Sequence, residues 1–80
     1  MKNVCEVKQI GNDHCVIITV PLSDMAILPT KLAIAQATFP DIKATTPAIN
    51  PADQTCSSRA DFGQNLERAL KYVELINSLF

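Results

Sequence analysis

The stretch NVCEVKQIGNDHCVIITV, residues 3–20, decides the fold that the sequence predicts. Apolar side chains alternate in its first half, and its second half is rich in β-branched residues, so each half predicts a β-strand. The Gly-Asn pair between them fits a two-residue hairpin loop. Such a loop sets Val7 opposite Val16 and Cys5 opposite Ile18, and the apolar faces of the two strands then coincide. We therefore expect an antiparallel β-hairpin.

The two strands of this hairpin cover residues 3–10 and 14–20. Their register places Cys15 opposite Lys8, on the other face from Cys5, so a disulfide between the two cysteines is disfavoured. An isolated hairpin is not stable in water. Other elements must therefore pack on it.

The segment after the hairpin carries mixed signals. Ser23 and Asp24 suit a helix start, but Pro29 interrupts the pattern, so we expect one turn over 23–28 and a helix from Thr30 to Thr38. An apolar stripe at helical spacing supports this helix. The stripe consists of Leu28, Leu32, Ala35 and Phe39.

Residues 41–46, DIKATT, read equally well as a short third strand or as an extended loop. Residues 44–58 hold two prolines and many small polar side chains, which predicts a surface crossover. Ser58 followed by Asp61 is a capping-box pattern, so we expect a last helix of about twenty residues from there to the chain end.

This last helix has more apolar surface than one packing layer needs. A first stripe consists of Phe62, Leu66, Ala69, Val73, Ile76 and Phe80. A second ridge consists of Tyr72, Leu75 and Leu79, and the two together span roughly 220° of the helix. Either the helix is wedged between the hairpin and the helix of residues 30–38, or Tyr72, Leu75, Leu79 and Phe80 bind another protein or a second copy.

Charge and hydropathy exclude several classes of function. Seven basic and eight acidic side chains give a formal net charge of -1, and neither sign forms a block, so nucleic-acid binding is not expected. We expect no signal peptide, because no continuous apolar stretch follows the first lysine, and no membrane span, because no twenty-residue apolar stretch occurs. A cytoplasmic protein is therefore expected. Apolar residues make up 48% of the 80 residues, so one packed domain, residues 1–80, is expected.

No catalytic, metal or cofactor site is expected. The cysteines are three and lack C-x-x-C spacing, and His14 and Cys15 are neighbours in a strand and so point to opposite faces. No phosphate-binding glycine motif occurs. A small anion or ligand site around Cys56 and Arg59, at the expected start of the last helix, is a minor alternative.

The sequence therefore predicts an α+β domain, an antiparallel β-hairpin with a possible short third strand packed with two α-helices, the C-terminal one long. Its expected function is non-enzymatic protein binding, with a homodimer possible. A charge-balanced domain of this length without a catalytic constellation is typical of phage or mobile-element inhibitors of larger proteins, of antitoxins and of adaptor subunits. The alternative is a nucleic-acid-associated accessory protein that uses Lys2, Lys8 and Lys43.

Overall fold

The computed structural model describes residues 3–80 and contains one sheet and two α-helices. The strands are β1 (Cys5–Ile10), β2 (Asp13–Pro21), β3 (Ala48–Asn50) and β4 (Thr55–Gly63). The helices are α1 (Leu28–Thr38) and α2 (Leu66–Leu79), and a short 3-10 turn covers Leu22–Asp24.

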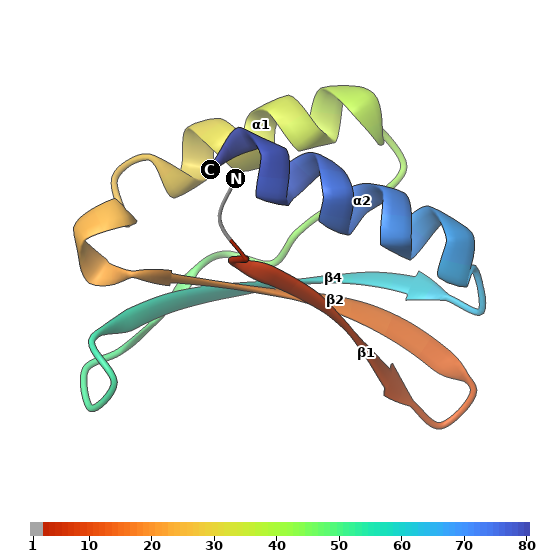
Figure 1. The fold of residues 1–80 in the computed structure, drawn as a ribbon, viewed down its shortest axis with the longest axis horizontal. Coiled ribbons are helices and arrows are strands. Elements are labelled where there is room, and N and C mark those ends of the chain that lie inside the picture. Colours follow the sequence, from red (N-terminus) through yellow and green to blue (C-terminus); the bar gives the residue numbers. More distant parts are fainter. Residues whose placement is uncertain (1–2) are drawn as a thin grey trace.

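The four strands form one antiparallel sheet in the order β1-β2-β4-β3. Both helices lie on the same face of this sheet, and the sheet curves away from them at both ends, so its other face is open and concave (Figure 1). This architecture confirms the α+β class and the two helices. The sheet is larger than a hairpin with one short extra strand, because β4 is a full central strand.

The hairpin of β1 and β2 is confirmed in its register. Cys5 lies opposite Ile18, and Val7 lies opposite Val16, as the two-residue loop requires. Gly11 in that loop has φ of 62°, a left-handed conformation that glycine adopts without steric cost. The register predicted from the matching apolar faces is therefore confirmed.

Helix α1 ends at Thr38 as expected but begins two residues early, at Leu28. Pro29 does not delay the helix because it occupies the first turn, where a backbone N–H has no helical partner in any case. Ser23 and Asp24 belong to the 3-10 turn and do not cap α1. The whole predicted stripe of α1 does face the core.

The expectation that the last helix begins near Ser58 is wrong. Residues 55–63 form β4, in which Ser58 is buried and its Oγ donates a 2.7 Å hydrogen bond to the carbonyl of Thr45. Asp61 is an exposed strand residue and not part of a capping box. The physical reason is that core-facing residues alternate along this segment, as in a strand, but several of them are too small to produce a clear hydrophobic pattern in the sequence. The core-facing residues are Cys56, Ser58, Ala60 and Phe62.

Residues 41–46 adopt the second of the two expected conformations, an extended loop, in which only Ala44 makes a β-bridge, to Ala60. The strand at this edge is β3, which lies inside the segment expected to be a surface crossover. Thr45 fastens the approach to β3, because its N–H donates to the carbonyl of Arg59 at 2.8 Å and its Oγ1 accepts from the N–H of Arg59 at 3.0 Å.

Helix α2 begins at Leu66 after a sharp turn out of β4. Gly63 has φ of 56°, and Asn65 is the N-cap, whose side-chain Oδ1 accepts a 3.1 Å hydrogen bond from the N–H of Arg68. The helix has 14 residues where about twenty were expected. Its buried residues Ala69, Tyr72 and Ile76 pack towards the sheet.

Replacing Asn65 with alanine tests this start of α2. The change removes the acceptor for the N–H of Arg68 and should lower the free energy of unfolding by roughly 1 kcal/mol. Urea denaturation followed by circular dichroism measures the loss. Gln64→Ala is the matched control, since Gln64 is exposed and lies outside the helix. A loss for Gln64→Ala equal to that for Asn65→Ala would contradict the assignment.

Candidate protein-binding surfaces

Tyr72, the central residue of the predicted binding ridge, is a core residue. Its exposed fraction is 2%, and burial raises the pKa of its hydroxyl to about 12, with a smaller contribution from nearby Cys5. A residue buried to this extent cannot contact a partner while the fold is intact. Tyr72 therefore offers almost no surface to a partner in this fold, and its role as a contact residue stays an untested prediction.

Tyr72 is the centre of an aromatic cluster that joins both helices to the sheet. Its ring centroid lies 5.5 Å from that of Phe39 and 5.1 Å from that of Phe62, both in edge-on geometry. Phe39 follows α1, and Phe62 lies on β4. Arg68 covers the outside of the cluster, with its guanidinium carbon 5.4 Å from the Phe39 ring and a bidentate ion pair to Asp41 at 2.7 Å.

The other three residues predicted to bind a partner are half-buried. Leu75 and Phe80 pack against the core cluster, and Leu79 is also of intermediate exposure. Two residues of the second ridge thus face the core: Tyr72 contacts Phe39 and Phe62, and Leu75 packs against the core cluster. Partner binding by Leu75, Leu79 and Phe80 is not tested by this arrangement, but their burial leaves little surface for it.

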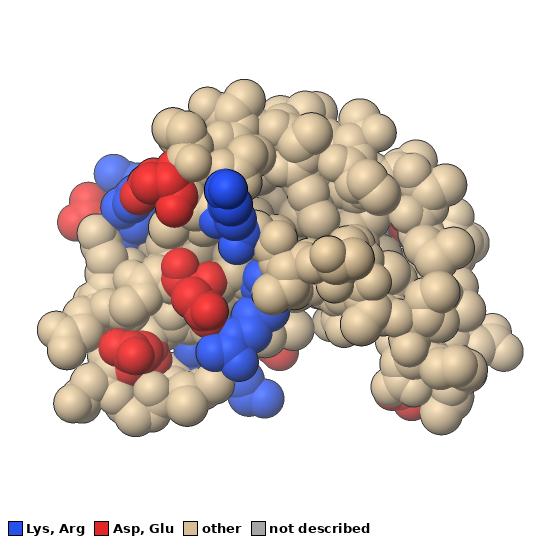
Figure 2. Space-filling view, turned by 180° about the vertical axis from the view of Figure 1, so that it is seen from behind, with Lys and Arg blue, Asp and Glu red and all other residues tan. Residues whose placement is uncertain are grey.

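The outer surface of α1 carries little charge and two exposed isoleucines. Lys31 is its sole charged residue, whereas α2 carries a charged outer face that includes Glu67, Lys71 and Glu74. Ile27 and Ile34, two helical turns apart and therefore on the same side, are 44% and 43% exposed. Seen from behind, charged side chains gather on the left of the molecule and are sparse over the upper surface where α1 lies (Figure 2).

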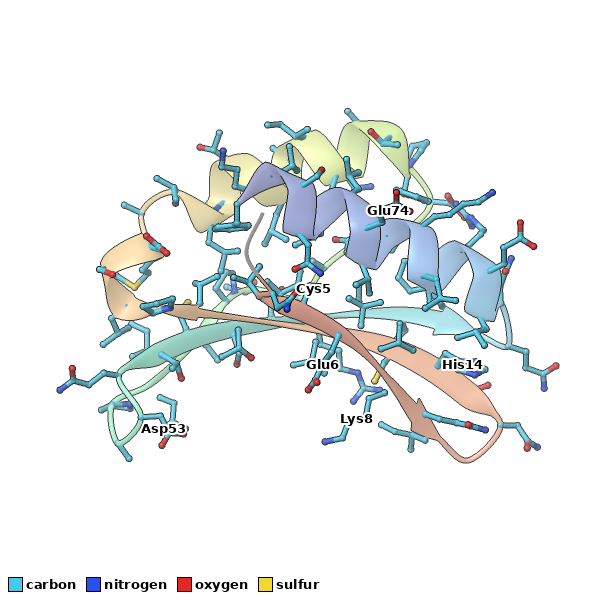
Figure 3. All side chains as sticks on the ribbon, viewed as in Figure 1. Cys5, Glu6, Lys8, His14, Asp53 and Glu74 are labelled. Carbon is cyan, nitrogen blue, oxygen red and sulfur yellow. The ribbon has the colours of Figure 1, made fainter. Side chains whose placement is uncertain are left out.

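The open face of the sheet carries alternating charges and not a basic patch. Glu6 and Lys8 project from β1 on the side away from the helices (Figure 3). Arg59 and Asp61 occupy the same face of β4 and form an ion pair at 2.8 Å. Each basic side chain here has an acidic neighbour two residues away on its strand. Lys2, another residue of the nucleic-acid alternative, lies outside the described residues.

A polar hollow of about 240 Å³ lies on the open face where β2 begins. His14 and Cys15 both line it, although neighbouring strand residues normally point to opposite faces. The exception has a visible cause: the β2–β4 register shifts between these two residues. The imidazole makes its polar contact through Nδ1, which lies 3.3 Å from the carbonyl oxygen of Gly63. His14 and Cys15 therefore lie close together without the hydrogen bond between the imidazole and the thiol that a nucleophile–base pair would require.

All three cysteines are free and buried. Cys56 is buried in the core on β4, and Arg59 lies on the same strand. Neither residue is at the start of a helix, which the minor ligand-site alternative required. Burial raises the pKa of the Cys5 thiol to about 12, and the charge of Glu6 adds to the rise. Over residues 3–80, no three histidine, cysteine or acidic side chains are placed to hold a metal ion.

No protein-family model, curated protein or solved structure shows a significant match to this chain. Within the part of the chain that the structure describes, no helix has the length and apolar character needed to cross a lipid bilayer. Any statement of function therefore depends on the surfaces described above.

Replacing Tyr72 with alanine should destabilise the fold. Removing a ring that contacts two other aromatic rings should cost about 3 kcal/mol or more of unfolding free energy, as for large-to-small changes in other cores. Urea denaturation measures the loss. Leu70→Ala, at an exposed position of the same helix, is the control and should change stability by less than about 0.5 kcal/mol. Similar small losses for both variants would place Tyr72 outside the core.

The buried thiol of Cys5 predicts a pH dependence of stability. Its folded pKa of about 12 is above the ordinary value of 9.0, so the folded protein keeps a proton that the unfolded chain releases in this window. The contribution of the Cys5 thiol to the free energy of unfolding is therefore fully present below pH 9 and is lost as the pH rises towards 12. Tyr72 adds to the fall above pH 10, its ordinary value.

Urea midpoints measured from neutral pH into this alkaline window test the prediction. In Cys5→Ala, the decline between pH 9 and pH 10 should be smaller than in the unmodified protein, because Tyr72, whose ordinary value is 10.0, contributes mainly above that range. Equal declines in the two proteins would show that the Cys5 thiol does not titrate differently on unfolding.

Proposed function

We propose that this protein is a non-enzymatic protein-binding module and that its contact surface is the outer face of α1. The carrying observation is the exposure of Ile27 and Ile34 on a helix with a single charged residue. Surface helices normally carry a polar outer face, and α2 in the same layer does so. Exposed apolar surface such as that of Ile27 and Ile34 gains free energy when a partner covers it.

The proposed partner is a larger protein that presents an apolar groove or helix face, with room at its rim for the charge of Lys31. The outer face of α1 also carries Ala33 and Ala37, whose small side chains let another backbone approach closely. Inhibition by covering a functional surface of that partner is the mode of action that suits a small domain with no proposed catalytic group. The cytoplasm remains the proposed location.

The nucleic-acid alternative is not favoured by a specific observation. Lys8 and Arg59 on the open face each have a nearby carboxylate, which opposes the accumulation of phosphate. A partner surface made of protein therefore remains the better proposal.

The test is affinity capture from the native host with the Ile27→Asp/Ile34→Asp double variant beside the unmodified protein. Two carboxylates on the outer face of α1 should reduce recovery of the partner at least tenfold, since each would be desolvated in the interface. Circular dichroism checks that the variant folds. Leu66→Asp, 42% exposed at the start of α2, is the matched control and should leave recovery unchanged.

Capture of a partner that is insensitive to Ile27→Asp/Ile34→Asp would overturn the proposed surface. Recovery of nucleic acid that weakens steeply with salt, with no protein partner, would overturn the proposed function in favour of its alternative.

A further inference from the structure

β1 is the long open edge of the sheet. Within residues 3–80 no strand lies beyond it, and it has six residues, whereas the opposite edge is the three-residue β3. The N–H of Thr19 donates to the carbonyl of Val4 at 2.8 Å, and inward and outward backbone groups alternate along an antiparallel strand. Glu6 and Lys8 therefore exchange hydrogen bonds with β2, and the backbone groups of Val7 and Gln9 point away from the sheet.

Asn77 of α2 closes the start of this edge. Its side-chain Oδ1 accepts hydrogen bonds from the N–H groups of Val4 at 2.9 Å and Cys5 at 3.1 Å, and its Nδ2 donates to the carbonyl of Cys5 at 3.4 Å. The outward N–H of Cys5 is thus satisfied within the chain. The part of the edge left for another strand is centred on Val7.

We propose that β1 pairs antiparallel with β1 of a second copy of this chain, with a two-fold axis perpendicular to the sheet and midway between Val7 of one copy and Val7 of the other. The two sheets then form one continuous eight-stranded sheet with all helices on one face. Val7 exchanges two backbone hydrogen bonds with Val7 of the second copy. The N–H of each Gln9 donates to the Cys5 carbonyl of the other copy, which has room for a second donor.

Charge complementarity selects this register. Three registers bring outward backbone groups of the two edges face to face near the centre of β1. With the axis between the two Val7 residues, Glu6 lies directly opposite Lys8 of the second copy, and Lys8 lies opposite its Glu6. Moving the axis by one residue puts Glu6 opposite Glu6 or Lys8 opposite Lys8, and like charges at directly opposed positions are destabilising.

The same register continues the charge pattern of the whole open face. Glu6 lies opposite Ile17, which lies opposite Arg59, so one row across the sheet runs from positive to negative. Lys8, Cys15 and Asp61 form the next row with the signs reversed. Joining the two copies extends both rows with strictly alternating charge. Glu6 and Lys8 take part in none of the ion pairs found within residues 3–80.

Exposed apolar side chains border the proposed junction on both faces of the sheet. Ile10 is 52% exposed on the open face and would lie opposite the start of the edge strand in the second copy. Leu70 is exposed on α2 and precedes Asn77 by two helical turns, so it shares the helix face that contacts β1. Pairing would reduce the exposure of both. This interface is separate from the outer face of α1 and does not rest on the partner proposed for that face.

The test is the mass of the protein in solution, measured by sedimentation equilibrium over a concentration series that reaches the millimolar range. The unmodified protein should approach twice its monomer mass of 8.7 kDa. Glu6→Lys alone and Lys8→Glu alone each create two like-charge pairs at the junction. Each should weaken dimerisation at least about tenfold, while circular dichroism shows an unchanged fold.

Charge exchange then identifies the register. The double variant Glu6→Lys/Lys8→Glu restores opposite charges and should recover the dimer. An equimolar mixture of the two single variants should form a heterodimer, because one chain then carries two lysines at the junction and the other carries two glutamates. The matched controls Asp53→Lys and Lys43→Glu change charge equally at exposed sites outside β1 and should dimerise as the unmodified protein does.

Two outcomes would overturn the proposal. One is a monomer at every concentration of the unmodified protein. The other is a dimer that Glu6→Lys and Lys8→Glu leave intact, which would place the contact on another surface. If Ile27→Asp/Ile34→Asp abolishes partner capture without changing the dimer, the two proposals stand separately, and either can fail while the other holds.

Discussion

The pairing of β4 with β2 is the constraint on which the rest of the structure depends. β4 returns antiparallel beside β2, and this central pair supplies most of the surface under the helices. Its core-facing residues on β4 include Ser58 and Ala60, which are small, so α2 can approach the sheet closely and bring Tyr72 against Phe62. Larger side chains at those two positions would separate the helix from the sheet and open the aromatic cluster.

A buried serine in this central strand is compatible with the core because it has a partner. The hydroxyl of Ser58 donates to the carbonyl of Thr45, so no polar atom is left unsatisfied there. The same bond holds the segment that leads into β3 against β4. The hydrogen bond that satisfies the buried hydroxyl of Ser58 thus also helps to hold the segment before β3 beside β4 in the four-stranded sheet.

The elements that could be predicted from the sequence are those in which large apolar residues repeat at the spacing of a strand or a helix. Val16, Ile18 and Val20 alternate clearly, and the loop length then fixed the register of β1 and β2. β4 has the same period of two, but small residues occupy half of its core positions, and hydropathy does not distinguish those from exposed positions. The helical spacing of Phe62 from Leu66 and Ala69 was coincidental, because Phe62 reaches the same core from the end of a strand.

The candidate surfaces were harder to predict than the fold, for a related reason. The wide apolar arc of α2 was correctly identified, yet a sequence does not tell which neighbour covers which side, and α1 with the sheet covers Tyr72. For α1 the stripe towards the core was predicted, but its outer side gives no signal in the sequence, because single exposed isoleucines are common on proteins. Only the contrast with the charged outer face of α2 makes that side unusual.

The two edges of the sheet are finished by different physical means. At β3 the edge is short, and Thr45 engages β4 with both its backbone and its hydroxyl, so little pairing capacity remains. At β1 only the start is closed, by the Asn77 side chain, and the remaining protection is electrostatic. A lysine on an exposed edge discourages pairing with most strands, but a glutamate two residues before it makes that protection selective. Pairing is unfavourable with a strand that places a glutamate opposite Glu6 or a lysine opposite Lys8. Pairing is favourable with a strand that places a lysine opposite Glu6 and a glutamate opposite Lys8. An antiparallel copy of the Glu-Val-Lys sequence supplies that exchanged pattern, so the same two side chains that guard the edge also specify what can pair with it.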